Sequence, residues 1–157
     1  MFESGDYRIV PFEPAHQQEA LELAEDILCV EHRLRTDLKD EQDLQDIAAA
    51  YAPPGGRFLV AIAKDEIVGT AGILRLSERD CELKRLYILP EHRRKGIASA
   101  LVGTLLPFVR EQGYRRMLLE VGPEMADTLH RYARYGFVPL AAGDDLPRPG
   151  EFLAIRL

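Results

Sequence analysis

Residues 81–98 constrain the fold of this chain most, because a strand ends there in a proline and a basic helix start follows at once. Residues 81–89 read C-E-L-K-R-L-Y-I-L, a run typical of a strand. Pro90 has no N–H to donate to a strand partner and therefore ends the strand. An apolar pattern of helical period begins at Ile97, directly after R-R-K-G at 93–96. The segment predicts a strand, a tight basic turn and a helix in immediate succession.

This turn has the composition of an anion site. The first N–H groups of a helix have no partner within the helix, and the peptide dipoles leave partial positive charge there. Arg93, Arg94 and Lys95 add three cations at the same place. The small residues Gly96 and Ala98 would let a phosphate approach the backbone without meeting a side chain. The alternative is a basic turn whose glycine serves only the backbone geometry, because a pattern as short as R-x-x-G-x-A recurs by chance.

Two downstream segments add to the R-x-x-G-x-A turn that follows L-K-R-L-Y-I-L-P. Met117–Met125 reads M-L-L-E-V-G-P-E-M, and Leu129–Phe137 reads L-H-R-Y-A-R-Y-G-F, with a Tyr four residues before a Gly-Phe pair. In this order the three segments resemble the acetyl-CoA signature, the next strand with its turn, and the closing motif of the GNAT superfamily of N-acetyltransferases. The resemblance covers most of the chain, strongly from Phe58 onward and loosely before it. Three motifs in order are far more specific than any one of them.

The resemblance implies the α/β (α+β) GNAT fold, with a central mixed, mostly antiparallel sheet flanked by about four helices. A single N-acetyltransferase domain is expected over residues 1–157. The alternating and apolar runs predict strands at Tyr7–Phe12, Phe58–Ala63, Ile67–Leu76, Cys81–Leu89, Arg116–Val121, Phe137–Leu140 and Glu151–Leu157.

Helical periodicity predicts four helices, which would cover both faces of that sheet. The first carries Ala20, Leu21, Ala24, Ile27 and Leu28 on its inner face, and the second is capped by Asp40 with Leu44, Ile47, Ala48 and Tyr51 inward. The third starts after Gly96 and is expected to kink or end early at Pro107. The fourth starts near Pro123 and ends at Gly136.

Composition restricts the class of protein. At 157 residues the chain is long enough for one domain with a substantial core, and 46% hydrophobic with 29% charged residues is typical of a soluble globular protein. No apolar run approaches the length of a membrane span and the N-terminus lacks a signal-peptide layout, so a cytoplasmic location is expected. The net charge of −6 argues against nucleic-acid binding. Cys29 and Cys81 are not spaced as a zinc pair, and we expect them to pack as apolar side chains with no metal site.

The resemblance further implies acetyl-CoA as a co-substrate at the basic turn. Its pyrophosphate would take N–H donors and cations from the turn, with Ser99 as a hydroxyl donor. Its pantetheine arm would bind the main chain of residues 86–88, where the family's strand splays from the one holding residues 118–120. The residues expected at the cofactor are Leu86, Tyr87, Ile88, Arg93, Arg94, Lys95, Gly96, Ile97, Ala98 and Ser99. Arg94 stands where the family often has glycine, which should keep the attraction for phosphate and crowd the turn.

Two residues are candidates for the chemistry of acetyl transfer. Glu82 stands where many members of the family carry the general base that removes a proton from the amine. The alternative is a half-exposed glutamate on a sheet face. Tyr132 matches the tyrosine that the family places beside the thioester sulfur, where a phenol can protonate the leaving thiolate. The alternative is an aromatic residue on the core face of a helix.

The acceptor is expected to be a small-molecule or peptide amine, acetylated by direct transfer in a ternary complex, because neither cysteine suits a covalent intermediate. Residues of the first two helices and the final loop would form its cleft, and many are acidic, which would suit a cationic acceptor. They are Glu25, Asp26, Glu31, Asp37, Asp40, Glu41, Asp43, Asp46, Asp144 and Asp145. The alternative is that these acidic residues form solvated helix faces. A rival function is a non-catalytic module that senses acyl-CoA, and a homodimer, frequent in the family, is among the open oligomeric states.

Overall fold

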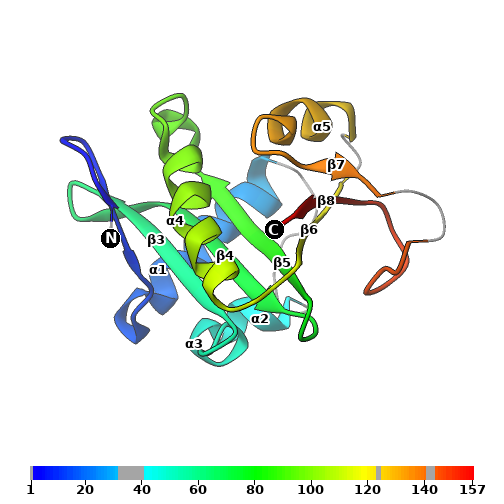
Figure 1. Cartoon of the computed structure of the whole chain (residues 1–157). Helices are drawn as coiled ribbons and strands as arrows, with labels where there is room; N and C mark the ends of the chain where they lie inside the picture. The colour runs from blue at the N-terminus through cyan, green and yellow to red at the C-terminus, as the bar shows by residue number, and fades with distance from the viewer. Residues whose placement is uncertain (1, 32–40, 123–124, 141–143) are drawn as a thin grey trace.

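An eight-stranded mixed sheet forms the centre of the computed structural model, which describes residues 2–31, 41–122, 125–140 and 144–157 (Figure 1). The strands are β1 (Phe2–Glu3), β2 (Arg8–Pro11), β3 (Arg57–Ala63), β4 (Glu66–Arg75), β5 (Asp80–Ile88), β6 (Arg116–Glu120), β7 (Val138–Pro139) and β8 (Phe152–Arg156). They lie in the order β1-β2-β3-β4-β5-β6-β8-β7. Neighbours are antiparallel except β5 and β6, which run parallel. This confirms the mixed, mostly antiparallel sheet, with the short β1 added to the predicted strands.

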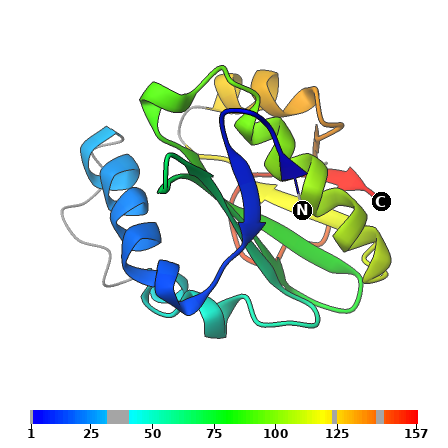
Figure 2. The same ribbon diagram turned by 90° about the vertical axis from the view of Figure 1, so that its left-hand side faces the viewer.

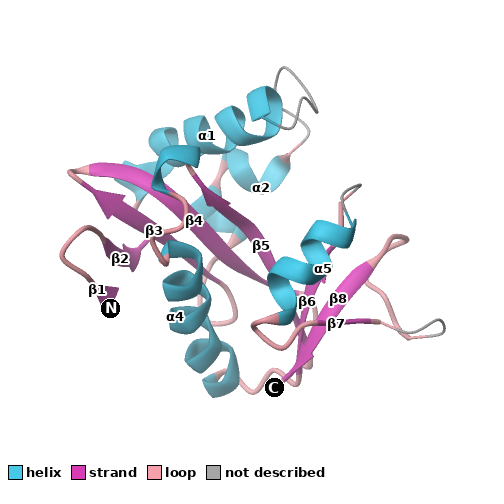
Figure 3. Ribbon diagram, turned by 90° about the horizontal axis from the view of Figure 1, so that it is seen from above, coloured by secondary structure: helices cyan, strands magenta, loops and turns pink. Residues whose placement is uncertain are grey.

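Helices cover both faces of the sheet. They are α1 (Gln17–Glu25), which continues as a π-helical turn (Asp26–Glu31), α2 (Gln42–Gln45), α3 (Ile47–Ala50), α4 (Ile97–Glu111) and α5 (Met125–Ala133). Figures 2 and 3 show α1 and α2 on one side of the sheet and α4 on the other. Two separate apolar clusters follow from this layering. One joins α4 to the sheet through residues such as Leu83, Leu101 and Leu105, and the other joins α1–α3 to it through residues such as Leu23, Ile47 and Val60.

Three predictions about the helices need correction. The second predicted helix is two short ones, because the carboxylate of Asp46 accepts a hydrogen bond from the Ala49 N–H (3.2 Å) and starts a new turn there. The described part of the chain therefore holds five α-helices. Ala48, predicted inward, is exposed. α4 does not end early, because exposed Pro107 lies on its outer side while Leu105 and Phe108 stay buried.

Other helix predictions are confirmed or lie outside the structure's description. Ala20, Ala24 and Ile27 are buried as predicted, and Gly136 takes a left-handed φ of +99° just past the end of α5. Asp40 and Pro123 lie outside the described residues. Within the described ranges, none of the helices is both long and apolar enough to cross a bilayer.

A β-bulge interrupts β5 on its β4 side. Thr70 pairs with Tyr87 and Gly72 with Lys84, so β5 carries one extra residue between these pairs. Arg85 lies in this bulge with φ of +58°, and its carbonyl oxygen accepts a hydrogen bond from the Thr70 hydroxyl at 2.7 Å. The bulge places Leu86 and Ile88 against the α4 side, whereas Tyr87 packs toward the α1–α3 side.

β5 and β6 separate after a short common ladder. Their partners are Asp80 with Arg116, Cys81 with Met117 and Glu82 with Leu118, and no later residue of these two fully described strands is paired between them. β5 nevertheless continues to Ile88 and β6 to Glu120. The split that the family resemblance implied is therefore present, and the end of β5 has strand partners on its β4 side alone.

Candidate active site

The basic turn connects β5 to α4 within eight residues, at the end of the split. Its entry is held by the Leu89 N–H, which donates to Val68 O (2.9 Å), and by Arg93 Nε, which donates to Ile88 O (3.0 Å). Arg94 and Gly96 both take left-handed backbone conformations, with φ of +63° and +83°. A left-handed φ suits glycine best, which agrees with the glycine that the family often has at the position of Arg94. Arg94 adopts this conformation at the expense of backbone strain.

The start of α4 is suited to bind an anion. Gly96 is its N-cap, and no side chain among the described residues caps the first turn. A Cβ atom placed on Gly96 would meet only Tyr7 Oη, at 3.7 Å, so the turn has free space on that side. Arg94 and Lys95 are exposed beside it, while Ile97 is buried and anchors the helix to the core. The unpaired N–H groups, the open glycine and the cations are the features that a pyrophosphate requires.

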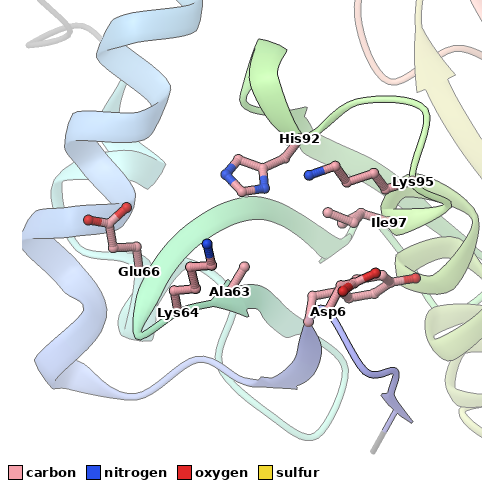
Figure 4. A pocket seen from close by; sticks show the side chains of 8 residues that line it. Asp6, Ala63, Lys64, Glu66, His92, Lys95 and Ile97 are labelled. Carbon is pink, nitrogen blue, oxygen red and sulfur yellow. The ribbon is translucent and has the colours of Figure 1, made fainter.

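A pocket of about 300 Å³ lies on the β3–β4 side of this turn (Figure 4). The split lies on the opposite side, between β5 and β6. The turn contributes His92, Lys95 and Ile97 to its lining. The opposite wall comes from the β1–β2 and β3–β4 connections and includes Tyr7 and Lys64. The structure thus directs Lys95 toward this pocket, while the start of α4 lies between the pocket and the split.

Three aromatic residues at the end of α5 pack together. The Tyr132 ring lies 6.0 Å from that of Phe137 and 6.2 Å from that of Tyr135, between centroids. The hydroxyl groups of Tyr135 and Ser99 are 3.0 Å apart, which links α5 to the first turn of α4 and gives the Ser99 hydroxyl a protein partner. Burial raises the pKa of the Tyr132 phenol, against the opposing effect of Arg131. Tyr132 therefore keeps its proton at neutral pH.

Glu82 occupies the last paired position before β5 and β6 separate, and its side chain is only 1% exposed. The sequence alternative of a half-exposed strand glutamate is wrong in this respect. Both carboxylate oxygens accept from Arg148: Nη1 lies 3.0 Å from Oε1 and Nη2 2.6 Å from Oε2. Arg148 Nη2 also lies 2.6 Å from Glu120 Oε1 on β6. Sequence reasoning missed Arg148, whose only local signal is its place between two prolines in the final loop.

A second ion-pair network joins α2 to the β5 bulge. The Arg85 guanidinium, 8% exposed, donates to both carboxylate oxygens of Asp43 (2.7 and 2.9 Å) and to Glu41 (2.9 Å). The guanidinium also donates to the Tyr87 hydroxyl (3.2 Å), and the Tyr51 hydroxyl donates to Asp43 (2.6 Å). Burial alone would raise the pKa of Asp43, but the hydrogen bonds from Arg85 and Tyr51 outweigh it and lower the pKa to about 2.

This network changes the interpretation of the acidic residues predicted to line an acceptor cleft. Glu41 and Asp43 neutralise Arg85, and Asp46 caps α3. Glu25, Asp26, Asp144 and Asp145 are exposed. Asp37 and Asp40, and the side chain of Glu31, lie outside what the structure describes. The described acidic residues therefore serve largely as structural partners or as solvated surface.

Comparison with known proteins agrees with this geometry. The profile of the Acetyltransferase (GNAT) family matches residues 19–137, most of the chain. The chain belongs to the GNAT acetyltransferase family. Human N-acetyltransferase 8 is 38% identical to this GNAT protein over 101 residues, which cover 60% of this chain and 44% of the human one. The chain spans about half the length of the curated relatives it matches.

Solved structures show the same GNAT fold. An acetyltransferase of the GNAT family from Staphylococcus aureus MU50 has a TM-score of 0.87 at 24% identity, covering 96% of this chain and 98% of its own. yncA, a putative acetyltransferase from Salmonella typhimurium determined with its cofactor acetyl-CoA, has a TM-score of 0.74 at 18% identity and covers 98% and 94%. At these identities the likeness establishes the fold alone.

Asp43→Asn tests the α2–β5 network of this GNAT protein. A carboxylate with a folded pKa of about 2, below its ordinary 3.8, stabilises the fold above pH 4, and this stability is lost as the pH falls from about 4 to about 2. Urea unfolding at several pH values should show the unchanged protein losing on the order of 2 kcal/mol more than the Asn variant over this range. The exposed Asp65→Asn in the β3–β4 turn is the control. Parallel curves for the protein and Asp43→Asn would contradict the network.

Proposed function

We propose that this GNAT protein is an N-acetyltransferase that moves an acetyl group from acetyl-CoA to an amine by direct transfer in a ternary complex. The observation that carries the proposal is the adjacency of the β5–β6 split and the uncapped start of α4. An extended amide-bearing arm with a pyrophosphate at one end matches these two features together. Cys81 gives no support to a covalent intermediate, because it is fully buried and burial raises the pKa of its thiol to about 12.

The β5–β6 split and the start of α4 would each bind one part of the cofactor. The pantetheine amides would pair with the main chain of residues 86–88, whose β6 side has no strand partner. The pyrophosphate would lie over the N–H groups from Ile97 to Ser99, with Arg94 beside it. Arg93 differs from the expectation in one respect, since its Nε holds the carbonyl of Ile88 and therefore shapes the turn. Lys95, on the rim of the 300 Å³ pocket, would contribute charge from the other side.

Acetyl-CoA supplies the thioester, and the chain must manage the protons. The acceptor ammonium has to lose one proton before its nitrogen attacks the thioester carbonyl, and a second once the C–N bond has formed. Because Glu82 is buried and clamped, we propose that it accepts the first proton through a water molecule. The second nitrogen proton passes to solvent after the C–N bond has formed. As the C–S bond breaks, the Tyr132 phenol donates its proton to the sulfur and is reprotonated from solvent.

One observation favours the rival function of a non-catalytic acyl-CoA sensor. Arg148 already donates a hydrogen bond to each carboxylate oxygen of Glu82, so a protein without catalytic activity could use this ion pair only to stabilise the fold. Such a sensor would keep the cofactor features and release no thiol. The acceptor is proposed to be cationic because exposed acidic residues remain on the elements expected to form its cleft, namely Glu25, Asp26, Asp144 and Asp145, and a cytoplasmic location is proposed from composition.

Release of free thiol from acetyl-CoA across a panel of primary amines tests the proposal. The panel should include a polyamine, lysine, a peptide with a free N-terminus and a neutral-bodied alkylamine. The enzyme proposal expects thiol release that depends on an amine. Tight acetyl-CoA binding with no release for any amine would favour the sensor.

The same assay separates chemistry from binding with Tyr132→Phe. Loss of the phenol should lower kcat and leave acetyl-CoA affinity nearly unchanged, because the thiolate is basic only in the transition state. Tyr114→Phe is the matched control, since its hydroxyl donates to Gly55 O (2.6 Å) in a different part of the fold. Full turnover of Tyr132→Phe would make Tyr132 a packing residue.

Gly96→Val should weaken acetyl-CoA binding severely, because a side chain would stand where the pyrophosphate meets the N–H groups of α4. Strain must be separated from this effect, because φ at Gly96 is +83°. Gly113→Val provides the control, with φ of +85° at the opposite end of α4 and open space around it. Calorimetric titration should show lost affinity in the first variant alone. Equal affinities in both would remove the turn from the cofactor site.

A further inference from the structure

Arg148 reaches from the final loop to the carboxylate that the proposed chemistry needs. Its guanidinium donates to both oxygens of Glu82, with a second carboxylate, Glu120, on Nη2. We propose that Arg148 is a positioning residue that holds Glu82 in the one orientation from which it can act as the base. This inference rests on the proposed function, and it names a residue that the family resemblance did not supply.

The position of this contact in the sheet supports the inference. Glu82 and Leu118 form the last pair of the β5–β6 ladder, and Glu120 lies two residues further along β6 on the same face. Arg148 therefore connects β5 and β6 through its ion pairs with Glu82 and Glu120, at the point where the main-chain pairing of the two strands ends. A group in this position fixes both the distance between the strands where the split begins and the orientation of the Glu82 carboxylate.

The geometry of the pair leaves Glu82 able to work. A carboxylate has about four lone-pair sites, and a bidentate arginine occupies one on each oxygen. The remaining sites point in directions fixed by the plane of the clamped carboxylate. Without Arg148, the Glu82 carboxylate, which is 1% exposed, would lose the partner that fixes its plane and would rotate toward another partner. The base would then be misplaced although Glu82 were still present.

Arg148 is itself held in place. Its Cζ lies 5.1 Å from the centroid of the Phe152 ring on β8, within the range of a cation–π contact. Pro147 and Pro149 flank it and limit the backbone freedom of the loop. The side chain is 35% exposed, so it reaches from the surface to a buried acid. These features are those of a preorganised support for one particular orientation.

The same ladder contains a matched ion pair at its other end. Arg116 donates from Nε and Nη2 to the two oxygens of Asp80, at 3.0 and 2.8 Å. Asp80 and Arg116 are also direct partners in the β5–β6 register, at the end away from the split. The Asp80–Arg116 pair is the same kind of carboxylate–guanidinium contact and lies on the same two strands, but it is away from the split. It distinguishes a positioning role from a structural one.

The test is a double-mutant cycle in kcat with Glu82→Gln, Arg148→Met and the two combined. Arg148→Met should lower kcat on the order of 10- to 100-fold, the usual effect of misplacing a reacting group, with acetyl-CoA Kd unchanged. In the Glu82→Gln background it should have no further effect on kcat, because Arg148 acts through Glu82. Arg148→Lys should recover part of the rate. Asp80→Asn removes the carboxylate of the other ion pair and leaves Arg116 Nη2 free to keep its hydrogen bond to Asp145 O (3.0 Å) in the final loop; it should lower the melting temperature and leave kcat within about twofold.

The inference would be overturned by independent, multiplying effects of the two changes on kcat, by an equal loss in Asp80→Asn, or by a rise of kcat in Arg148→Met. The last would mean that Arg148 obstructs Glu82.

If Arg148→Met folds poorly, the combined variant, which has no uncompensated buried charge, supplies the comparison with Glu82→Gln. The same cycle in urea unfolding needs no turnover and should show strong coupling between the two residues. If unfolding shows no coupling, the positioning role of Arg148 is contradicted, even if the enzyme is active. If unfolding shows coupling but the unchanged protein releases no thiol, the proposed function is contradicted instead.

Discussion

The separation of β5 from β6 is the constraint on which the rest of the molecule depends. They are the only parallel neighbours in the described sheet, joined by α4, and they share three residue pairs before diverging. A strand edge without partners is costly if it is buried, since each unpaired N–H or C=O loses its hydrogen bonds to water. The fold therefore has to hold the split open, and in the proposed function the cofactor would supply the hydrogen bonds that the edge of β5 lacks. Each neighbouring feature can be understood from this requirement.

Two ion-pair systems surround the divergent part of β5. Arg148 joins Glu82 to Glu120 at the apex, and Arg85 fixes the bulge to α2 through Asp43. Compared with apolar side chains of similar size, a buried ion pair adds little net stability, because its attraction roughly offsets the cost of removing the charges from water. Their effect is on geometry, since each fixes one segment of β5 to an element distant in sequence. The strand can then diverge from β6 without losing its own shape.

The local parts of this site could be predicted from the sequence and the distant ones could not. The turn at 90–96 was predictable because a proline, three cations and a glycine act within a few residues of one another. The partner of Glu82 was not, because Arg148 is 66 positions away and the contact depends on the path of the final loop. Asp43 was interpreted as a cleft acid for the same reason, since Arg85 is 42 positions from it. Pro107 was expected to kink α4 or end it early, but the helix continues through it to Glu111, because the apolar face extends on either side of the proline.

Hydrogen–deuterium exchange with and without acetyl-CoA tests the central claim most directly, because it reports on the backbone groups that the account leaves to the cofactor. The amides of residues 86–88 and of the first turn of α4 should gain protection when acetyl-CoA is added. The Arg116–Glu120 strand, already paired with β8, should change little away from the split. Protection of the 300 Å³ pocket with unchanged exchange at 86–88 and 97–99 would contradict the account.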